Sequence, residues 1–254
     1  MINNIELAKG KKAIFASDMH LGLFPLEKSF EREKLIVKWL DSIKPDVQVL
    51  FLLGDVFDFW YEYKKVIPRG FSRFIGKLCE LSDAGVEIHF FTGNHDIWVF
   101  DYLPKEVGLT LHRHLEEFSI NGKSFLIGHG DDLNPHDIGY KFLKAVFTNK
   151  FLQFLFSRIH PNFSMWFGLR WSRNSRYSKG ISEEFMGKEK EHQIVFASQT
   201  LKKKQVDYFV FGHRHLALVQ PIENDSVFIN LGEWIQTNSY AEFDGQKMDL
   251  KYYR

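Results

Sequence analysis

A short run early in the chain, Val47–Leu53, is apolar at every position except Gln48. A strand with apolar residues at successive positions is covered on both faces, which is typical of a parallel strand lying between other layers. Helical patterns flank this run: Phe30–Ile43 precedes it, and Phe71–Asp83 follows it and stops at Gly85. The chain is therefore expected to fold as a layered α/β protein.

Further strands are expected on both sides of this region. Asn121-Gly122 lies between apolar runs within Phe118–Ile127 and indicates a hairpin turn. The other runs with strand character are Lys12–Ser17, Val86–Thr92, Val206–Gly212, Ser226–Leu231 and Tyr240–Tyr252. Strands alternate with helices early in the chain and form hairpins later, which favours a mixed sheet or two sheets.

Composition excludes several classes of protein. The 254 residues fit a single domain over 1–254, and 33 Lys and Arg against 32 Asp and Glu give a net charge of +1, which disfavours nucleic-acid binding. The longest unbroken aliphatic or aromatic run, Val49–Leu53, is far shorter than the roughly 20 apolar residues of a membrane-spanning helix. The N-terminus lacks a signal-peptide pattern, and a single cysteine, Cys79, excludes an intramolecular disulfide. We therefore expect a cytoplasmic protein.

Five short polar motifs follow predicted strands in order. They are Asp18-Met19-His20, Gly54-Asp55-Val56-Phe57-Asp58, Gly93-Asn94-His95-Asp96, Gly128-His129-Gly130-Asp131 and Gly212-His213-Arg214-His215. In open α/β sheets, ligands bind beyond the carboxyl ends of the strands, so these side chains are expected to converge. Each motif alone is more often a turn than a site, but five of them at strand ends indicate one shared site.

Carboxylate, imidazole and carboxamide groups are ligands for Mn²⁺, Fe²⁺ or Zn²⁺, and the motifs contain no thiolate that would favour a softer metal. One ion could be surrounded by Asp18, His20, Asp55 and His215, and a second by Asp55, Asn94, His129 and His213. The two oxygens of Asp55 could bridge ions about 3.5–4 Å apart, which is the usual spacing of two-metal sites.

This series of motifs resembles the calcineurin-like metallophosphoesterase superfamily, whose pattern is D-x-H, G-D-x-x-D, G-N-H-D/E, G-H and G-H-x-H. The resemblance implies a sandwich of two mixed β-sheets flanked by helices, with two divalent ions, expected to be Mn²⁺ with Fe²⁺ or Zn²⁺ as alternatives. It also implies that His95 is the general acid or transition-state donor and that Asp58 orients it. The implied reaction is attack on phosphorus by a hydroxide held between the ions, since metal binding lowers the pKa of water toward about 7.

Residues 141–190 differ from the rest of the chain. They contain ten Lys or Arg against three Glu, and eleven aromatic residues. Pro161 divides the segment, so two helices are expected. We interpret the segment as a helical cap inserted in the domain, because a basic and aromatic surface suits a ligand that carries both phosphate and acyl chains.

Within the superfamily, the chain most resembles the UDP-2,3-diacylglucosamine hydrolase family, which cleaves a pyrophosphate to UMP and 2,3-diacylglucosamine 1-phosphate in lipid A synthesis. The resemblance rests on Ser17–Leu21, Gly54–Trp60, Gly128–Leu133 and the helical insertion. Proteobacterial members read G-N-R-D where this chain has Gly93–Asp96. The resemblance implies a nucleotide-sugar lipid as substrate.

The same resemblance carries substrate contacts onto named positions. They are Asp137 and Ser175, with Lys179 as a substitute for the lysine of the family. Arg173 and Arg176 are further candidate contacts for the diphosphate, because they belong to the basic insertion. The cap is also expected to rest on an anionic membrane surface at its cytoplasmic face. No obligate protein partner and no nucleic acid are expected. Two alternatives stay open at this point: a related phosphodiesterase or pyrophosphatase for another lipid-linked or nucleotide substrate, and a non-catalytic scaffold.

Overall fold

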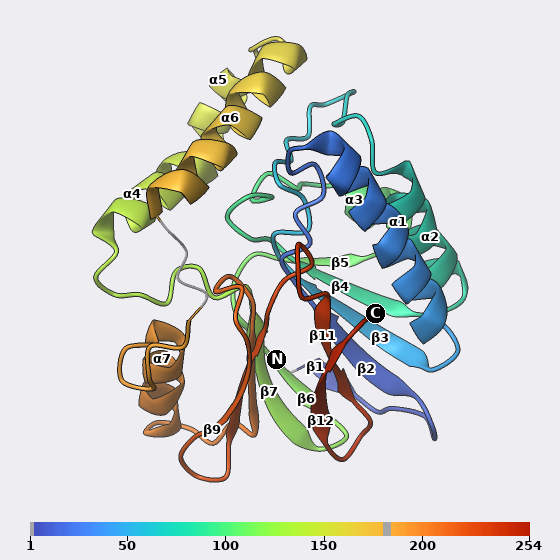
Figure 1. The fold of residues 1–254 in the computed structure, drawn as a ribbon, viewed down its shortest axis with the longest axis vertical. Coiled ribbons are helices and arrows are strands. Elements are labelled where there is room, and N and C mark those ends of the chain that lie inside the picture. Colours follow the sequence, from blue (N-terminus) through green and yellow to red (C-terminus); the bar gives the residue numbers. More distant parts are fainter. Residues whose placement is uncertain (1–2, 180–183) are drawn as a thin grey trace.

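Two six-stranded sheets form the centre of the molecule (Figure 1). The computed structural model describes the backbone of residues 3–179 and 184–254 and the side chains of residues 3–173 and 184–254. One sheet contains, in spatial order, β1 (Asn3–Ile5), β6 (Glu116–Ile120), β7 (Lys123–Gly128), β8 (Tyr208–Phe211), β10 (Val227–Leu231) and β9 (Ala217–Pro221). The other contains β12 (Met248–Tyr252), β11 (Ser239–Phe243), β2 (Lys12–Ala16), β3 (Val47–Leu53), β4 (Glu87–Phe91) and β5 (Thr110–His112).

Both sheets mix parallel and antiparallel pairs, as predicted. In the second sheet, β2, β3, β4 and β5 run parallel, while β11 is antiparallel to β2. In the first, β7, β8 and β10 run parallel, β9 is antiparallel to β10, and β6 is antiparallel to β7 and parallel to β1. The parallel strands of each sheet therefore end at a common edge.

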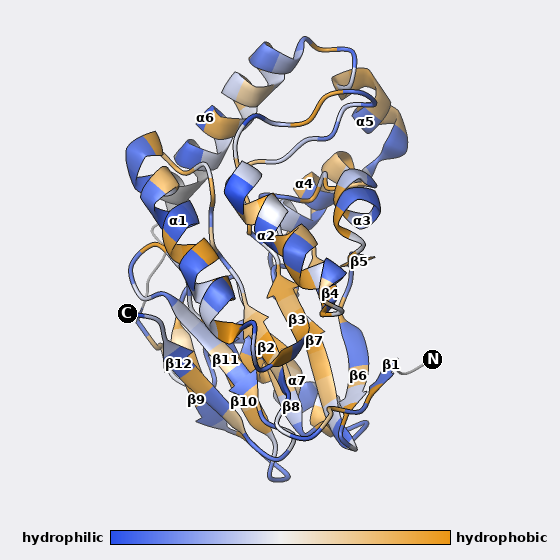
Figure 2. Ribbon diagram, turned by 90° about the vertical axis from the view of Figure 1, so that its right-hand side faces the viewer, coloured by the Kyte–Doolittle hydropathy of each residue, from blue (hydrophilic) through white to orange (hydrophobic). Residues whose placement is uncertain are grey.

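Alternation along each strand explains why the sheets pack in layers. In β2 and β3, Phe15 and Phe51 point between the sheets, where their rings stack with centroids 4.7 Å apart. Their neighbours Ile14 and Leu50 point to the other face and pack with Trp39 of α1 (Leu26–Ile43). The strand Val47–Leu53 is thus apolar throughout because both of its faces are buried; Figure 2 shows the apolar strands β2, β3 and β7 inside the molecule.

Helices cover the outer faces of both sheets (Figure 1). Beside α1, α2 (Ser72–Asp83) and α3 (Tyr102–Val107) pack on the second sheet through a shared apolar core. The first sheet is covered by α7 (His192–Leu201), whose Ile194 and Ala197 pack on Phe209. The expected sandwich of two mixed sheets flanked by helices is confirmed.

Three helices project from one end of the sandwich and are called the cap below (Figure 1). They are α4 (Ile138–Thr148), α5 (Lys150–Phe156) and α6 (Pro161–Lys179). The expectation of two helices in this region is wrong, because Asn149 adopts an extended conformation that ends α4, and its side chain then accepts the first backbone N–H groups of α5. The break at Pro161 is where it was expected.

Aromatic side chains hold the cap on the sandwich. Tyr61 and Trp98, buried at the sheet end, pack against Phe147 and Phe156 of the cap. Trp98 Nε1 donates to the backbone oxygen of Phe147 at 2.8 Å, and the Tyr61 hydroxyl donates to that of Gln153 at 2.8 Å. Within residues 3–179 and 184–254, every helix is too short or too polar to span a bilayer.

Candidate metal centre

The five polar motifs meet at the edge where parallel strands of both sheets end. The predicted metal ligands follow these strands: Asp18 and His20 after β2, Asp55 after β3, Asn94 after β4, His129 after β7, and His213 and His215 after β8. Most of these side chains are buried, although the loops lie at the end of the sandwich. The topology therefore gathers residues that are far apart in the sequence, as expected for a crevice beyond strand ends.

One group of ligands consists of Asp18, His20 and His215, whose ligand atoms lie within 4.8 Å of one another. The Nε2 atoms of His20 and His215 are 3.0 Å apart, and His215 Nε2 is 3.2 Å from Asp18 Oδ1. Two nitrogen ligands about 2.1 Å from one ion and about 90° apart would be separated by about 3.0 Å. The spacing of this group therefore fits a common divalent ion.

A second group consists of Asp55, His129 and His213. Asp55 Oδ2 is 3.4 Å from His129 Nε2, and Asn94 Oδ1 is 3.3 Å from the same nitrogen. Asp55 Oδ2 is also 3.9 Å from His20 Nε2, which belongs to the first group. Asp55 thus lies between the two groups, where its carboxylate can contribute to both.

Two further observations test whether these residues suit metal ions. Asp18 Oδ1 is fully buried and has no hydrogen bond within the described residues, although such an atom normally has a partner. Gly54 and Gly93 allow the ligands to crowd together: a Cβ on Gly54 would lie 2.7 Å from His129 Nδ1, and one on Gly93 would collide with the Asp55 carboxylate. A compact donor set of oxygen and imidazole nitrogen with an unsatisfied carboxylate oxygen fits a divalent cation.

The backbone of the ligand loops is strained. Positive φ angles occur at five ligands: Asp18 (54°), His20 (45°), Asp55 (51°), His213 (70°) and His215 (53°). Such conformations are uncommon for residues other than glycine and cluster at functional sites. Nothing in the sequence predicts them, because Asp and His also occur in ordinary turns. The surrounding sheets stabilise these loops in positions that aim the side chains inward.

Charges in the site keep the carboxylates ionised. Burial disfavours the charged form of Asp18, but the neighbouring His215 outweighs burial and lowers the pKa of Asp18 to about 2. Burial also disfavours the charged form of Asp55, yet His129 and His95 hold the pKa of Asp55 well below its usual range. Burial lowers the pKa of His129, but the charge of Asp55 outweighs it and raises that pKa to about 10. Asp18 and Asp55 therefore carry negative charge at neutral pH, which favours binding of a cation.

Asp96 supports the second group and was not predicted to have a role. Its fully buried carboxylate accepts the backbone N–H groups of Gly93 (2.7 Å) and Val56 (2.8 Å), which belong to two different ligand loops. Burial, reinforced by the charge of Asp55, raises the pKa of Asp96 to about 7. The aspartate after G-N-H therefore ties the loop after β4 to the loop after β3. The sequence signal for this role was the position of Asp96 as the last residue of the motif Gly93-Asn94-His95-Asp96.

His95, predicted as the general acid or donor, lies close to His20 and Asp55: one ligand atom from each of the three lies within 4.8 Å of the others, and His95 Nε2 is 4.0 Å from Asp55 Oδ2. Its Nδ1 is 3.0 Å from the backbone oxygen of Asp58. The predicted orienting carboxylate of Asp58 accepts a hydrogen bond from Ser172 Oγ at 3.0 Å, and Ser172 Oγ is also 3.0 Å from His95 Nδ1. Ser172 belongs to the cap helix α6 and was missed by the sequence analysis, which selected Ser175 instead.

Two of the predicted substrate contacts, Asp137 and Arg173, have described side chains, and each contacts another part of the chain. Asp137 caps α4 by accepting the N–H of Tyr140 at 2.8 Å, and Arg173 places its guanidinium 4.9 Å from the ring centroid of Phe24. The side chains of the other three predicted contacts lie outside the described residues, and only their place in α6 is known: Ser175, Arg176 and Lys179.

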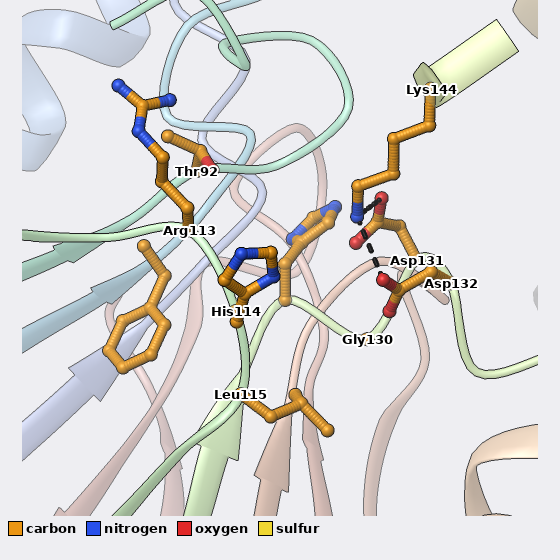
Figure 3. A pocket seen from close by; sticks show the side chains of 10 residues that line it. Thr92, Arg113, His114, Leu115, Gly130, Asp131, Asp132 and Lys144 are labelled. Atoms are coloured by element: carbon orange, nitrogen blue, oxygen red, sulfur yellow. Dashed lines mark hydrogen bonds and ion pairs between the residues drawn. The ribbon is translucent and has the colours of Figure 1, made fainter. Parts of the chain in front are cut away.

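A small polar pocket lies beside His129 (Figure 3). Lys144 of α4 enters it from the cap and bonds Asp131 at 2.9 Å and Asp132 at 3.1 Å. Arg113 lines the same pocket and donates to the backbone oxygens of Ile97 and Val99. The Lys144 contact fixes the start of the cap next to a metal-ligand loop.

Comparisons with known proteins agree with this arrangement of motifs. Residues 11–217 match the family model of the calcineurin-like phosphoesterases. The chain is 36% identical to the UDP-2,3-diacylglucosamine hydrolase of Porphyromonas gingivalis, over 94% of this chain and 97% of that protein. It is 27% identical to the hydrolase of the same name from Histophilus somni (91% and 96%) and 28% identical to that from Neisseria meningitidis (91% and 92%).

Proposed function

The chain belongs to the calcineurin-like phosphoesterase family, and we propose that it hydrolyses the pyrophosphate bond of UDP-2,3-diacylglucosamine to UMP and 2,3-diacylglucosamine 1-phosphate. The observation that carries this proposal is a buried two-group ligand set directly beneath an aromatic, basic cap. The full-length likeness to hydrolases named for this substrate supports it. The complete set of acidic and imidazole ligands argues against a non-catalytic scaffold.

The two groups would hold two divalent ions, which we propose to be Mn²⁺. Asp18, His20 and His215 would hold one, His129, His213 and Asn94 the other, and Asp55 would contribute to both. Bound there, the ions would supply a nucleophile at neutral pH and offset charge on the phosphoryl oxygens.

The chain's own residues perform the remaining tasks. Since the backbone oxygen of Asp58 can only accept, His95 carries a proton on Nδ1 and turns Nε2 toward the metal groups. A protonated Nε2 can then donate to a phosphoryl oxygen or to the leaving oxygen, and such a donor typically contributes 10²–10⁴-fold in rate. The backbone tie through Asp96 keeps the loops in place, so little reorganisation is needed when the substrate reacts.

The cap supplies the apolar surface that acyl chains require. Seven large aromatic side chains on its described residues are at least 45% exposed: Phe142, Phe151, Phe154, Phe163, Trp166, Phe167 and Trp171. Arg158 lies over the ring of Phe154 and Arg170 over that of Trp166, so cations border the apolar surface. An exposed apolar area of this kind on a soluble domain marks a binding surface. We propose that it receives the acyl chains and contacts an anionic membrane surface at the cytoplasmic face.

Comparing acylated and non-acylated substrates tests the proposed specificity. Purified protein with Mn²⁺ should release UMP from UDP-2,3-diacylglucosamine in detergent micelles much faster than from UDP-N-acetylglucosamine, because the latter cannot occupy the cap. Equal rates on the two substrates would contradict a role for the cap in substrate recognition.

Flotation with phosphatidylglycerol vesicles tests the membrane contact. The variant Phe163→Ser/Trp166→Ser should float less than the wild type, whereas Val219→Ser, which removes an exposed apolar side chain on β9, should behave like the wild type. Equal flotation of all three proteins would contradict the proposed surface.

A further inference from the structure

A hydroxyl group from the cap reaches the centre of the candidate site. Ser172 is on α6, far along the chain from the ligand loops, yet it is only 4% exposed and its Oγ contacts both His95 and Asp58. Among residues 161–173 of α6, most others are exposed or half-buried, including its neighbours Trp171 and Arg173. Ser172 is therefore a residue through which α6 contacts the site.

The chemistry of the three groups determines which one donates in each of these hydrogen bonds. Ser172 Oγ donates its proton to Asp58 Oδ2 at 3.0 Å, which leaves the oxygen lone pairs to accept from His95 Nδ1 at 3.0 Å. The same Nδ1–H also faces the backbone oxygen of Asp58 at 3.0 Å. The carboxylate of Asp58 is thus linked to the imidazole of His95 through a hydroxyl, and linked hydrogen bonds of this kind strengthen one another.

The depth at which α6 enters is fixed by a close contact one turn earlier. A Cβ on Gly168 would collide with the ring of Phe59, the residue that follows Asp58 in the chain. The absence of a side chain at Gly168 therefore lets the helix approach the loop that carries Asp58. Leu169 and Met165 pack on the same aromatic cluster and hold the helix there.

From this geometry we infer that Ser172 is a positioning residue for His95, so that the catalytic arrangement is complete only when the cap is seated. Ser172 acts through His95: it holds Nδ1, and Nε2 is thereby kept facing the metal groups. This inference rests on the proposed function, because it assigns His95 the donor role described there. The cap and the donor His95 are thus connected through the Ser172 hydroxyl.

A double-variant cycle with Ser172→Ala and His95→Ala tests the inference. Loss of one hydrogen bond that orients a donor should lower kcat about tenfold, with KM within about twofold of the wild type. His95→Ala should lower kcat by about 10²–10⁴-fold. In the His95→Ala background, Ser172→Ala should cost nothing further, because its effect is exerted through the missing imidazole.

The control variant is Ser164→Ala, which removes a buried serine from the same helix. Ser164 bonds the hydroxyl of Tyr63 and lies two turns from Ser172, so its loss removes a buried hydroxyl from α6 without touching His95. The bonds from Tyr61 and Trp98 to the cap remain and keep it seated. It should leave kcat unchanged. Metal content and melting temperature, measured for every variant, identify any protein that has lost its fold or its ions.

Two results would overturn the inference. A Ser172→Ala variant with wild-type kcat would show that the hydroxyl does not matter, and losses that multiply in the double variant would show that Ser172 acts independently of His95, as a substrate contact would. If the wild type cleaves bis(p-nitrophenyl) phosphate but not UDP-2,3-diacylglucosamine, the proposed function fails. The same cycle, measured with the diester, then decides the role of Ser172 separately.

Discussion

Asp55 lies between the two ligand groups. Its carboxylate lies 3.4 Å from His129 and 3.9 Å from His20, and its Oδ1 accepts the backbone N–H of His95 at 2.9 Å. The residue thus joins both metal positions to the donor loop. Its backbone is in the left-handed region, with φ of 51°, which turns the carboxylate into the site.

Replacement of Asp55 by alanine should remove both ions and reduce activity to background. The two groups then lose their shared ligand, and the charges of their histidines are no longer offset. Elemental analysis after dialysis against Mn²⁺ measures the bound metal, and Asp101→Ala, at an exposed site near α3, serves as the matched control. A variant that retains both ions would contradict the shared role of Asp55.

His95 should behave differently from the ligands. His95→Ala is expected to lower kcat by about 10²–10⁴-fold while metal content stays near that of the wild type, because all seven predicted ligands remain in place. Turnover and elemental analysis on the same sample measure both quantities. Simultaneous loss of metal would identify His95 as a ligand instead of a donor.

At the scale of elements, each helix is placed by a few large side chains. Trp39 of α1 is fully buried, and its ring centroid is 4.6 Å from that of Trp234 and 5.3 Å from that of Tyr240. Trp234 follows β10, and its backbone N–H donates to the backbone oxygen of Asp18 at 3.1 Å. The packing of α1 therefore supports a ligand loop.

Truncation of Trp39 to alanine should lower the free energy of unfolding by about 3–5 kcal/mol, because it leaves a large cavity between α1 and the second sheet. Urea denaturation measures the change. Lys38→Ala, on the exposed side of the same helix, should change stability by less than about 0.5 kcal/mol. A Trp39→Ala loss as small as that of the control would show that α1 is not packed as described.

At the scale of the whole molecule, the meeting of the ligands at the strand ends was easier to predict from sequence than the way the cap packs on the sandwich. The motif that ends with Asp55 directly follows a strand that is apolar throughout, so local pattern and the rule for parallel sheets were enough to gather the ligands. Ser172 could not be found in this way. Its position depends on contacts between distant segments, such as Gly168 against Phe59, that leave no periodic signal. The third cap helix was missed because Asn149 is unremarkable until its capping bonds are seen.

Stability of the whole fold should depend on pH through a buried histidine pair between the sheets. His89 Nδ1 is 2.9 Å from His112 Nε2, and burial lowers the pKa of each to about 4 from an ordinary value of 6.5. Between pH 6.5 and 4 the unfolded chain binds protons that the folded chain does not, so the free energy of unfolding falls as the pH falls through this window.

The melting temperature of the variant His89→Leu/His112→Leu should therefore fall less than that of the wild type when the pH is lowered from 7.5 to 5. Both proteins are measured with chelator present, so that metal loss does not contribute. An equal loss in the two proteins would show that other groups set the acid sensitivity.

Metal-dependent release of UMP is the measurement that tests the proposed function most directly. Purified protein is incubated with UDP-2,3-diacylglucosamine in detergent micelles, first with excess chelator and then with added Mn²⁺, and UMP and the lipid phosphate are quantified. UMP and 2,3-diacylglucosamine 1-phosphate should form in equal amounts only after Mn²⁺ is added. No release, together with metal-dependent cleavage of bis(p-nitrophenyl) phosphate, would retain the metal centre and contradict the proposed substrate.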